Sequence, residues 1–295
     1  MKKHKIFEGV GTALITPFRD GKIDFCALHK LIDMQVEGGA DAIVICGTTG
    51  ECATLSDYER YSLYEASKDM VGGRTKLIFG TGTNDTSAMI RHSKEAEKYS
   101  PDGILVVSPY YNKGTEMGIA EHYEALIKRV DLPIIIYNVP SRTGVNLSLS
   151  TLKKLSSYES IVGIKEAGDS MSRYTSLSSF GDELPLYAGN DNHFYQSLTL
   201  NGAGVISVIS NVLCEDMKRI YTLTRNGEWE SARLMQCRML ELIDALFYET
   251  NPAPIKWLMS TLGLVSDEIR LPLTMPSHEC QRIIADRYRS YTNNQ

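Results

Sequence analysis

The sequence Pro-Ile-Ile-Ile-Tyr-Asn-Val-Pro at residues 133–140 shows the pattern that decides the fold. Its apolar residues follow one another without polar alternation, which is typical of a strand covered on both faces by helices. Seven further β-rich runs recur along the chain, most of them similarly continuous, and we predict a strand in each. The eight predicted strands are Gly11–Phe18, Ala42–Gly47, Lys76–Gly82, Gly103–Tyr110, Pro133–Pro140, Ile161–Ala167, Pro185–Asn190 and Gly204–Asn211.

Segments with helical periodicity separate most of these strands. They include Asp24–Glu37, Asp57–Met70, Thr115–Val130 and Ser148–Ser157, and Ser56 with a glutamate three residues later forms a predicted capping box. Strands that alternate with helices place the chain in the α/β class, and eight such units predict a (β/α)8 TIM barrel. An open, doubly wound sheet is the alternative, and the eight regular units favour closure.

A helical segment follows the eighth predicted strand. It is about 80 residues long, more than the single helix that completes a barrel. Helical patterns cover Trp229–Glu249, Asn251–Leu262 and Pro276–Tyr288, and no linker rich in Pro, Gly or Ser precedes them. We therefore predict a catalytic barrel over residues 1–225 and a helical subdomain over residues 226–295 that packs on it.

Composition excludes several classes of protein. A chain of 295 residues with 43% hydrophobic and 23% charged residues has the apolar surface that a disordered chain lacks. Its net charge of −5 provides no basic field for nucleic acid or an anionic membrane. The longest apolar runs, such as Val205–Ile209, fall far short of the roughly 20 residues of a membrane span. We expect no nucleic-acid or membrane partner.

The N-terminus and the cysteines bear on the compartment. Basic residues near the N-terminus are followed by Glu8 and two glycines, which interrupt the apolar core that an export signal requires. The six cysteines show neither a CxxC pair nor zinc-binding spacing, so we expect buried free thiols in a reducing compartment. These observations predict a cytoplasmic protein.

Lys165 ends an otherwise apolar strand. Because side chains alternate along a strand, we expect Gly163 and Lys165 to point into the barrel, and Val162 and Ile164 to face the helices. Burial disfavours the ammonium form and lowers the pKa of a lysine from about 10.4 toward neutrality. A neutral amine is the nucleophile that forms an imine with a ketone. A salt bridge with Glu166 is the alternative, and the position of the lone lysine at a strand end favours the nucleophile.

Hydroxyl-bearing residues and an arginine follow other predicted strands. These positions lie at the carboxyl-terminal face of a barrel, where active-site residues are found. Tyr137 and Tyr111 are candidates for proton transfer, although each taken alone is equally typical of a core residue. Thr48 and Thr49 offer hydroxyls and turn amides suited to a small carboxylate. Arg142 suits bidentate binding of a carboxylate, with a salt bridge inside its loop as the alternative.

The residues at these strand ends favour neither a metal site nor a site for a phosphorylated substrate. The converging His, Asp and Glu ligands of a divalent metal are missing from the pattern. Asn190 and Asp191 follow the seventh predicted strand without a nearby lysine or arginine, which disfavours a phosphate group.

Two specific motifs carry a resemblance to a known family. They are Gly-Thr-Thr-Gly-Glu at residues 47–51 and Tyr-Asn-Val-Pro-Ser-Arg-Thr-Gly at residues 137–144. Together with residues 11–18 and Asn-Pro-Ala-Pro-Ile-Lys at residues 251–256, they make nearly the whole chain resemble the pyruvate-dependent class I aldolases and lyases related to N-acetylneuraminate lyase.

Within this family, the double threonine and Arg142 resemble the branch that condenses pyruvate with L-aspartate 4-semialdehyde in lysine and diaminopimelate biosynthesis. Sialic acid lyases usually carry Ser-Thr in the first motif and lack the arginine. An aldolase for a sugar acid, such as 2-keto-3-deoxygluconate or N-acetylneuraminate, is the alternative. A barrel that had lost catalysis would lack at least one catalytic group, and none is missing here.

The resemblance implies a role for each matching residue. Lys165 would form the Schiff base with pyruvate, and Tyr137 would donate and accept protons through Thr48 and Tyr111. In the family, the tyrosine that matches Tyr111 reaches into the neighbouring subunit, which implies a homo-oligomer, usually a tetramer of two tight dimers. Thr49 and the backbone of Ile206 would hold the pyruvate carboxylate and its surroundings.

The remaining implications concern the second substrate and regulation. Arg142 would bind the carboxylate of L-aspartate 4-semialdehyde, and no metal or organic cofactor is implied. Some relatives are inhibited by lysine bound at the tight-dimer interface. This chain has Ala88 where the regulated pattern places a glutamate, while Asp57 and Arg60 replace its aromatic ligands. We therefore predict insensitivity to lysine, with added repulsion from Arg60.

Overall fold

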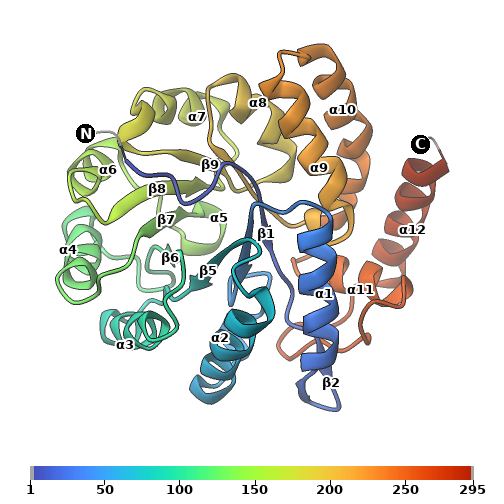
Figure 1. Ribbon diagram of the computed structural model, residues 1–295, viewed down its shortest axis with the longest axis horizontal. Helices are drawn as coiled ribbons and strands as arrows, with labels where there is room; N and C mark the ends of the chain where they lie inside the picture. The colour runs from blue at the N-terminus through green and yellow to red at the C-terminus, as the bar shows by residue number, and fades with distance from the viewer. Residues whose placement is uncertain (1–2, 294–295) are drawn as a thin grey trace.

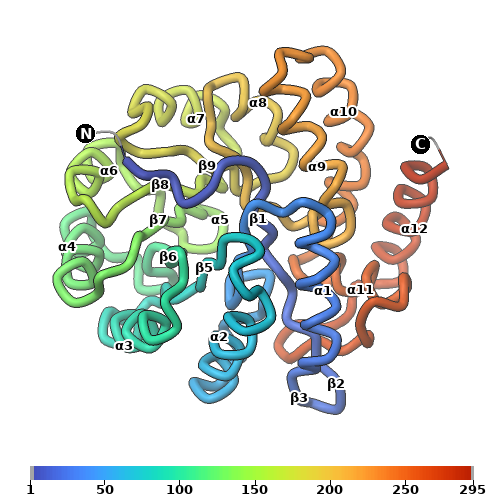
Figure 2. Tube along the Cα trace, in the orientation of Figure 1, coloured from blue at the N-terminus to red at the C-terminus, as the bar shows by residue number. Residues whose placement is uncertain are grey.

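The computed structural model of the protein describes residues 3–293, which contain a closed barrel of eight parallel strands (Figures 1 and 2). Strand β1 pairs with β4 on one side and with β10 on the other, which closes the barrel. The barrel strands are β1 (Gly9–Ala13), β4 (Ala42–Ile45), β5 (Lys76–Gly80), β6 (Gly103–Val107), β7 (Ile134–Asn138), β8 (Ile161–Glu166), β9 (Leu186–Ala188) and β10 (Gly204–Ser207). All eight predicted strands are present, and the predicted TIM barrel is confirmed.

Helices surround the barrel on its outer face (Figure 1). A short hairpin of β2 (Phe18–Arg19) and β3 (Lys22–Ile23) precedes the first helix and was not predicted. The capping box at Ser56 is confirmed. Within residues 3–293, eight α-helices precede the last barrel strand and α9 follows it directly: α1 (Phe25–Glu37), α2 (Asp57–Val71), α3 (Thr86–Glu97), α4 (Glu116–Ile127), α5 (Pro140–Thr143), α6 (Leu149–Ser156), α7 (Met171–Ser178), α8 (Phe194–Thr199) and α9 (Ser210–Arg225).

Two apolar clusters divide the core. One fills the barrel, and the other packs between the strands and the helices. Ile164 belongs to the outer cluster, as predicted, but Val162 packs in the interior cluster, contrary to the prediction. A register shift explains the difference: Ile134 pairs with Ile161 and Ile135 pairs with Gly163, so Val162 is an extra residue in β8. Strict alternation resumes after this bulge and turns the side chain of Lys165 inward.

Three further helices lie together on one side of the barrel, coloured orange to red in Figure 1: α10 (Trp229–Leu246), α11 (Ala253–Thr261) and α12 (His278–Asn293). Helix α10 packs against α9 and α12. A buried ion pair joins α11 to the loop after β4, because Lys256 Nζ donates to Glu51 Oε1 over 2.5 Å. The C-terminal helices predicted from the sequence are confirmed, while the exact boundary between residues 225 and 226 stays a prediction.

Among residues 3–293, no helix has the length and apolar character needed to cross a bilayer. All six cysteines are free, as predicted. Cys46, Cys214 and Cys280 are buried, but Cys26 and Cys237 are exposed, so the expectation that the thiols are buried is only partly correct. The two exposed cysteines lie on the solvent faces of amphipathic helices, where a single residue carries no burial signal of its own.

Candidate active site

A cavity of about 240 Å³ opens at the carboxyl end of the barrel. Thr48, Thr49, Tyr137, Arg142 and Lys165 all line it, so five of the seven predicted site residues meet in one place. A larger, open groove of about 780 Å³ lies between α1, α9, α10 and α12 and contains none of these five residues. The smaller cavity is therefore the candidate active site.

Lys165 and Tyr137 face each other in this cavity. Strands β7 and β8 pair the two residues in register, and Lys165 Nζ lies 4.3 Å from the centre of the Tyr137 ring. Burial lowers the pKa of Lys165 to about 8; the negative charge of Asp191 opposes this shift and the positive charge of Arg142 adds to it. The amine is therefore far more readily deprotonated than that of an ordinary lysine.

The Tyr137 phenol is held in its protonated form. Burial raises its pKa, opposed first by the charge of Arg142 and then by a hydrogen bond with the Thr48 side chain. A neutral phenol with a hydroxyl partner beside an amine can give a proton to a substrate and recover it from Thr48. The geometry supports acid–base chemistry next to a nucleophilic lysine.

Asn251 connects the other two polar groups of the cavity. Its side-chain Nδ2 donates to Thr49 Oγ1 over 3.0 Å, and its main-chain oxygen accepts a hydrogen bond from Arg142 Nη2 over 3.0 Å. Within residues 3–293, the Arg142 side chain donates to a main-chain carbonyl and forms no ion pair with a carboxylate. The arginine thus keeps donors for a ligand, and the alternative of a salt bridge within its loop is not supported.

Asp191 contributes a buried negative charge beside the lysine. Its Oδ2 accepts hydrogen bonds from the amides of Val208 and Ile209 over 3.0 and 2.9 Å. Burial nevertheless raises the pKa of the Asp191 carboxyl, partly offset by a hydrogen bond with Ser207. From the sequence, Asp191 was noted as a residue that follows a strand and as an argument against a phosphate group, while Asn251 was noted only as part of a motif.

Two predicted site residues lie outside the cavity. Tyr111 is 88% exposed and has a positive φ of 72°, so it projects from a turn after β6 into solvent. Ile206 is fully buried in the interior cluster, and the residue of this segment that lines the cavity is Val208. The structure of one chain therefore leaves Tyr111 away from the site, and the contact predicted for the main chain of Ile206 stays a prediction.

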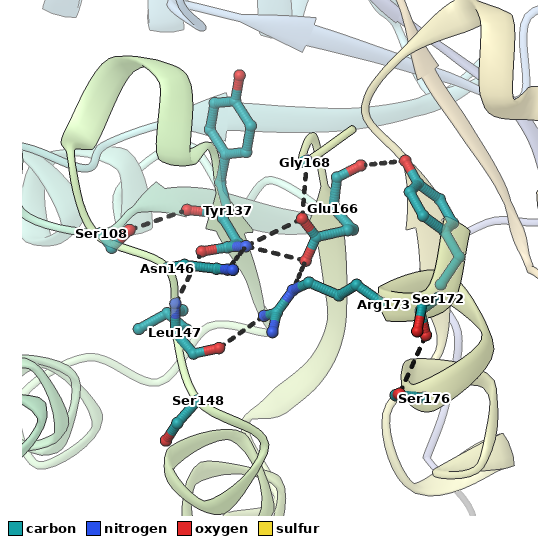
Figure 3. A network of polar contacts seen from close by, with 12 residues as sticks. Ser108, Tyr137, Asn146, Leu147, Ser148, Glu166, Gly168, Ser172, Arg173 and Ser176 are labelled. Atoms are coloured by element: carbon teal, nitrogen blue, oxygen red, sulfur yellow. Dashed lines mark hydrogen bonds and ion pairs between the residues drawn. The ribbon is translucent and has the colours of Figure 1, made fainter. Parts of the chain in front are cut away.

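Glu166 does not pair with Lys165. Its buried carboxylate forms an ion pair with Arg173 Nε over 2.8 Å and accepts two hydrogen bonds from Asn138, on the outer side of the strands (Figure 3). The alternative reading of Lys165 as the partner of a salt bridge with Glu166 is therefore wrong. The lysine remains available to a ligand.

Comparison with known proteins agrees with this geometry. The model of a family described as the dihydrodipicolinate synthetase family matches residues 6–287. The chain belongs to this family. A relative in the dihydrodipicolinate synthetase family, the 4-hydroxy-tetrahydrodipicolinate synthase of Clostridium novyi, is 44% identical over 269 residues, which cover 91% of each chain.

Solved structures of the dihydrodipicolinate synthetase family share the whole fold. The 4-hydroxy-tetrahydrodipicolinate synthase of Methylacidiphilum fumariolicum superposes with a TM-score of 0.95 at 37% identity, covering 97% of this chain and 96% of the other. A relative from Cyanidioschyzon merolae, solved with lysine bound, has a TM-score of 0.95 at 34% identity and covers 98% and 99% of the two chains. These matches confirm the family to which the sequence motifs pointed.

Proposed function

We propose that this protein is a lyase that condenses pyruvate with L-aspartate 4-semialdehyde to give 4-hydroxy-tetrahydrodipicolinate, in lysine and diaminopimelate biosynthesis. Its membership of the dihydrodipicolinate synthetase family and the names of its relatives support this function. The single observation that carries it is the meeting of Lys165 and Tyr137 with Arg142 in one cavity.

The first half of the reaction activates pyruvate. The neutral amine of Lys165 attacks the ketone carbon, and loss of water leaves an imine whose protonated form draws electrons from the neighbouring methyl group. Removal of a methyl proton then gives an enamine. Tyr137 moves protons in these steps and exchanges them with Thr48, while Thr49 holds the pyruvate carboxylate.

The second half forms the new carbon–carbon bond. Arg142 binds the carboxylate of L-aspartate 4-semialdehyde and places its aldehyde above the enamine, which attacks the aldehyde carbon. Tyr137 protonates the resulting alkoxide. The amine of the adduct then displaces Lys165 from the imine carbon as the ring closes, which restores the free enzyme.

A comparison of substrates tests this function. We expect turnover of pyruvate with L-aspartate 4-semialdehyde to exceed retro-aldol cleavage of 2-keto-3-deoxygluconate and of N-acetylneuraminate, since Arg142 suits the carboxylate of a short amino acid. Initial rates with all three substrates on one preparation decide the question. Faster cleavage of a sugar acid would contradict the proposal and favour the sugar-acid aldolase.

The lowered pKa of Lys165 predicts how adduct formation depends on pH. With a pKa of about 8, roughly one amine in ten is neutral at pH 7, against about one in three thousand for an ordinary lysine. The rate of imine formation with pyruvate, sampled at each pH by a borohydride quench, is expected to rise about tenfold per pH unit below pH 7 and to level off above pH 8. A rate that still rises from pH 9 to pH 10 would contradict this pKa.

We also propose that the active form is a homo-oligomer, with a tetramer of two tight dimers as the expected state. Tyr111 and Met117 are 88% and 70% exposed in the same segment after β6, and aromatic and methionine side chains of this kind are enriched at interfaces. In a dimer, Tyr111 of the partner subunit would extend the proton relay of Thr48 and Tyr137.

The change Tyr111→Phe tests the relay. It is expected to lower kcat by about tenfold or more, because it removes the hydroxyl and keeps the aromatic surface. Sedimentation of both proteins should show the same oligomer. A wild-type protein that is a fully active monomer, or a variant with unchanged kcat, would contradict the proposal.

Asp57 bears on the predicted insensitivity to lysine. Its half-exposed carboxylate forms an ion pair with Arg91, since Oδ2 lies 3.3 Å from Arg91 Nε. Oδ1 lies 3.8 Å from His92 Nδ1, but burial lowers the pKa of His92 to about 4, so this ring is neutral near pH 7. With Ala88 in place of a glutamate, an ammonium group of lysine would be poorly paired, at a cost of about 1–3 kcal/mol. Initial rates with and without millimolar lysine are expected to agree, and clear partial inhibition would contradict the prediction.

The placement of Arg60 corrects one part of this argument. Its side chain is buried and donates to the carbonyl oxygens of Cys52 and Gly80 over 2.7 and 3.3 Å. The guanidinium is therefore used inside the subunit, and the expected repulsion from Arg60 is withdrawn. The prediction of insensitivity now depends on Ala88 and Asp57.

The proposed location is the cytoplasm. The six free thiols are typical of a reducing compartment, and the substrates of the proposed reaction are small metabolites. We propose neither a cofactor nor a nucleic-acid or membrane partner.

A further inference from the structure

Figure 3 shows a buried polar cluster around Glu166 and Arg173, on the side of the strands away from the ring of Tyr137. In the register of β7 and β8, Tyr137 pairs with Lys165 and the next residues, Asn138 and Glu166, pair with each other. Because side chains alternate along strands, Asn138 and Glu166 point away from the cavity toward α7. Tyr137 and Lys165 therefore project from one face of strands β7 and β8, and Asn138 and Glu166 project from the opposite face.

Glu166 is the centre of the cluster. It is fully buried, and its carboxylate accepts four hydrogen bonds: two of 2.9 Å from Asn138 Nδ2, one of 2.7 Å from the amide of Gly168 and one of 2.8 Å from Arg173 Nε. Its main-chain oxygen accepts a further bond of 2.6 Å from the Tyr174 hydroxyl. These contacts join the ends of β7 and β8 to helix α7.

Asn138 closes the turn that carries Arg142. Its Oδ1 accepts a hydrogen bond from the amide of Leu147 over 3.1 Å, and its Nδ2 donates to Asn146 Oδ1 over 2.9 Å. Arg173 Nη2 holds the same turn from the other side, by donating to the main-chain oxygen of Leu147 over 2.7 Å. Arg142 lies at the centre of the segment from residue 139 to residue 145. The side chain of Asn138, directly before this segment, is hydrogen-bonded to the residues directly after it and so holds its two ends together.

We propose that Asn138, Glu166 and Arg173 are positioning residues that set the distance between the imine-forming lysine and Arg142. Lys165 is fixed by the hydrogen-bond ladder of its strand, whereas Arg142 lies in the single helical turn of α5, outside the ladder, and Asn138 and its partners hold the two ends of this segment. A misplacement of about 1 Å between reacting groups can cost about 100-fold in rate. The inference rests on the proposed function, because it assigns the aldehyde substrate to Arg142.

The change Glu166→Gln tests this role. Donors point at both carboxylate oxygens, so the NH2 group of a glutamine faces donors in either orientation and the cluster cannot be satisfied. We expect kcat/KM for L-aspartate 4-semialdehyde to fall about 10- to 100-fold, mainly through a higher KM. Formation of the pyruvyl adduct, measured by mass after borohydride reduction, is expected to stay close to that of the wild type.

A milder variant and a matched control complete the experiment. Arg173→Lys keeps the charge but cannot reproduce the two bonds of the guanidinium fork, so we expect a smaller rise in the same KM, and this variant decides the question should Glu166→Gln not fold. Thr12→Val removes another buried bond between a barrel strand and its helix, from Thr12 Oγ1 to Gln35 Oε1 over 2.8 Å. This control is expected to lower the melting temperature and leave both kinetic steps unchanged.

The outcomes separate this inference from the proposed function. A wild-type protein that forms no pyruvyl adduct or does not use the aldehyde would overturn the function itself. With an active wild type, the inference is overturned by variants with an unchanged KM for the aldehyde. It is also overturned by adduct formation and condensation that fall by the same factor, because an equal loss is what general destabilisation produces.

Discussion

Replacement of Lys165 with alanine is expected to lower kcat by at least about 10³-fold, because it removes the nucleophile on which every later step depends. The fold should survive, since the amine forms no ion pair within residues 3–293: Glu166 pairs with Arg173 instead. The Asp191 carboxylate beside the amine keeps its two main-chain amide donors after the change. Initial rates with pyruvate and L-aspartate 4-semialdehyde measure the loss, and thermal unfolding of both proteins checks the fold.

A second buried lysine provides the control for this prediction. Lys256 is fully buried and has a lowered pKa, as Lys165 has, but it donates to Glu51 and to the main-chain oxygen of Thr16 away from the cavity. Peptide mapping of the reduced wild-type adduct should find pyruvate on Lys165 and none on Lys256. Substantial activity in the Lys165→Ala variant would contradict the covalent mechanism.

The change Tyr137→Phe is expected to lower kcat by about 10²- to 10⁴-fold. It removes the hydroxyl that moves protons at the imine and at the alkoxide, while the ring that packs 4.3 Å from Lys165 Nζ remains. The loss should appear in the formation of the pyruvyl adduct as well as in the full reaction, since both steps need the proton donor.

Tyr123 supplies a matched control for this change. Its ring is fully buried, and its hydroxyl donates to the main-chain oxygen of Val106 over 2.9 Å, outside the cavity. Tyr123→Phe is expected to cost about 1 kcal/mol of stability and to leave kcat unchanged. Equal effects of the two tyrosine changes on kcat would show that Tyr137 acts only through packing.

The strands were predictable because each is a short apolar run, and the errors in them are local. The predicted strands ran several residues too far at their carboxyl ends, as at Tyr110 and Asn190, which lie beyond the paired residues of β6 and β9. The backbone of Asn190 is still extended but has no ladder partner. The bulge at Val162 was not predictable. An extra residue in a strand is defined by the register of its neighbour, which a single apolar run does not reveal.

The site was predictable where its residues end a strand, as Lys165 and Tyr137 do. Asn251 was missed as a site residue because it lies 202 positions from Thr49, and only the packing of the C-terminal helices on the barrel brings the two together. The partner of Glu166 was missed for a similar reason, since Arg173 reaches it from the following helix. Contacts of this kind depend on how the elements pack, and no local pattern encodes them.

The central claim is that Lys165 forms a covalent imine with pyruvate, and one measurement tests it most directly. The purified protein is incubated with pyruvate, reduced with borohydride, weighed intact and then mapped by peptide. We predict one reduced pyruvyl group per chain, carried by Lys165. An unchanged mass, or a modification spread over exposed lysines with Lys165 unmodified, would contradict the account.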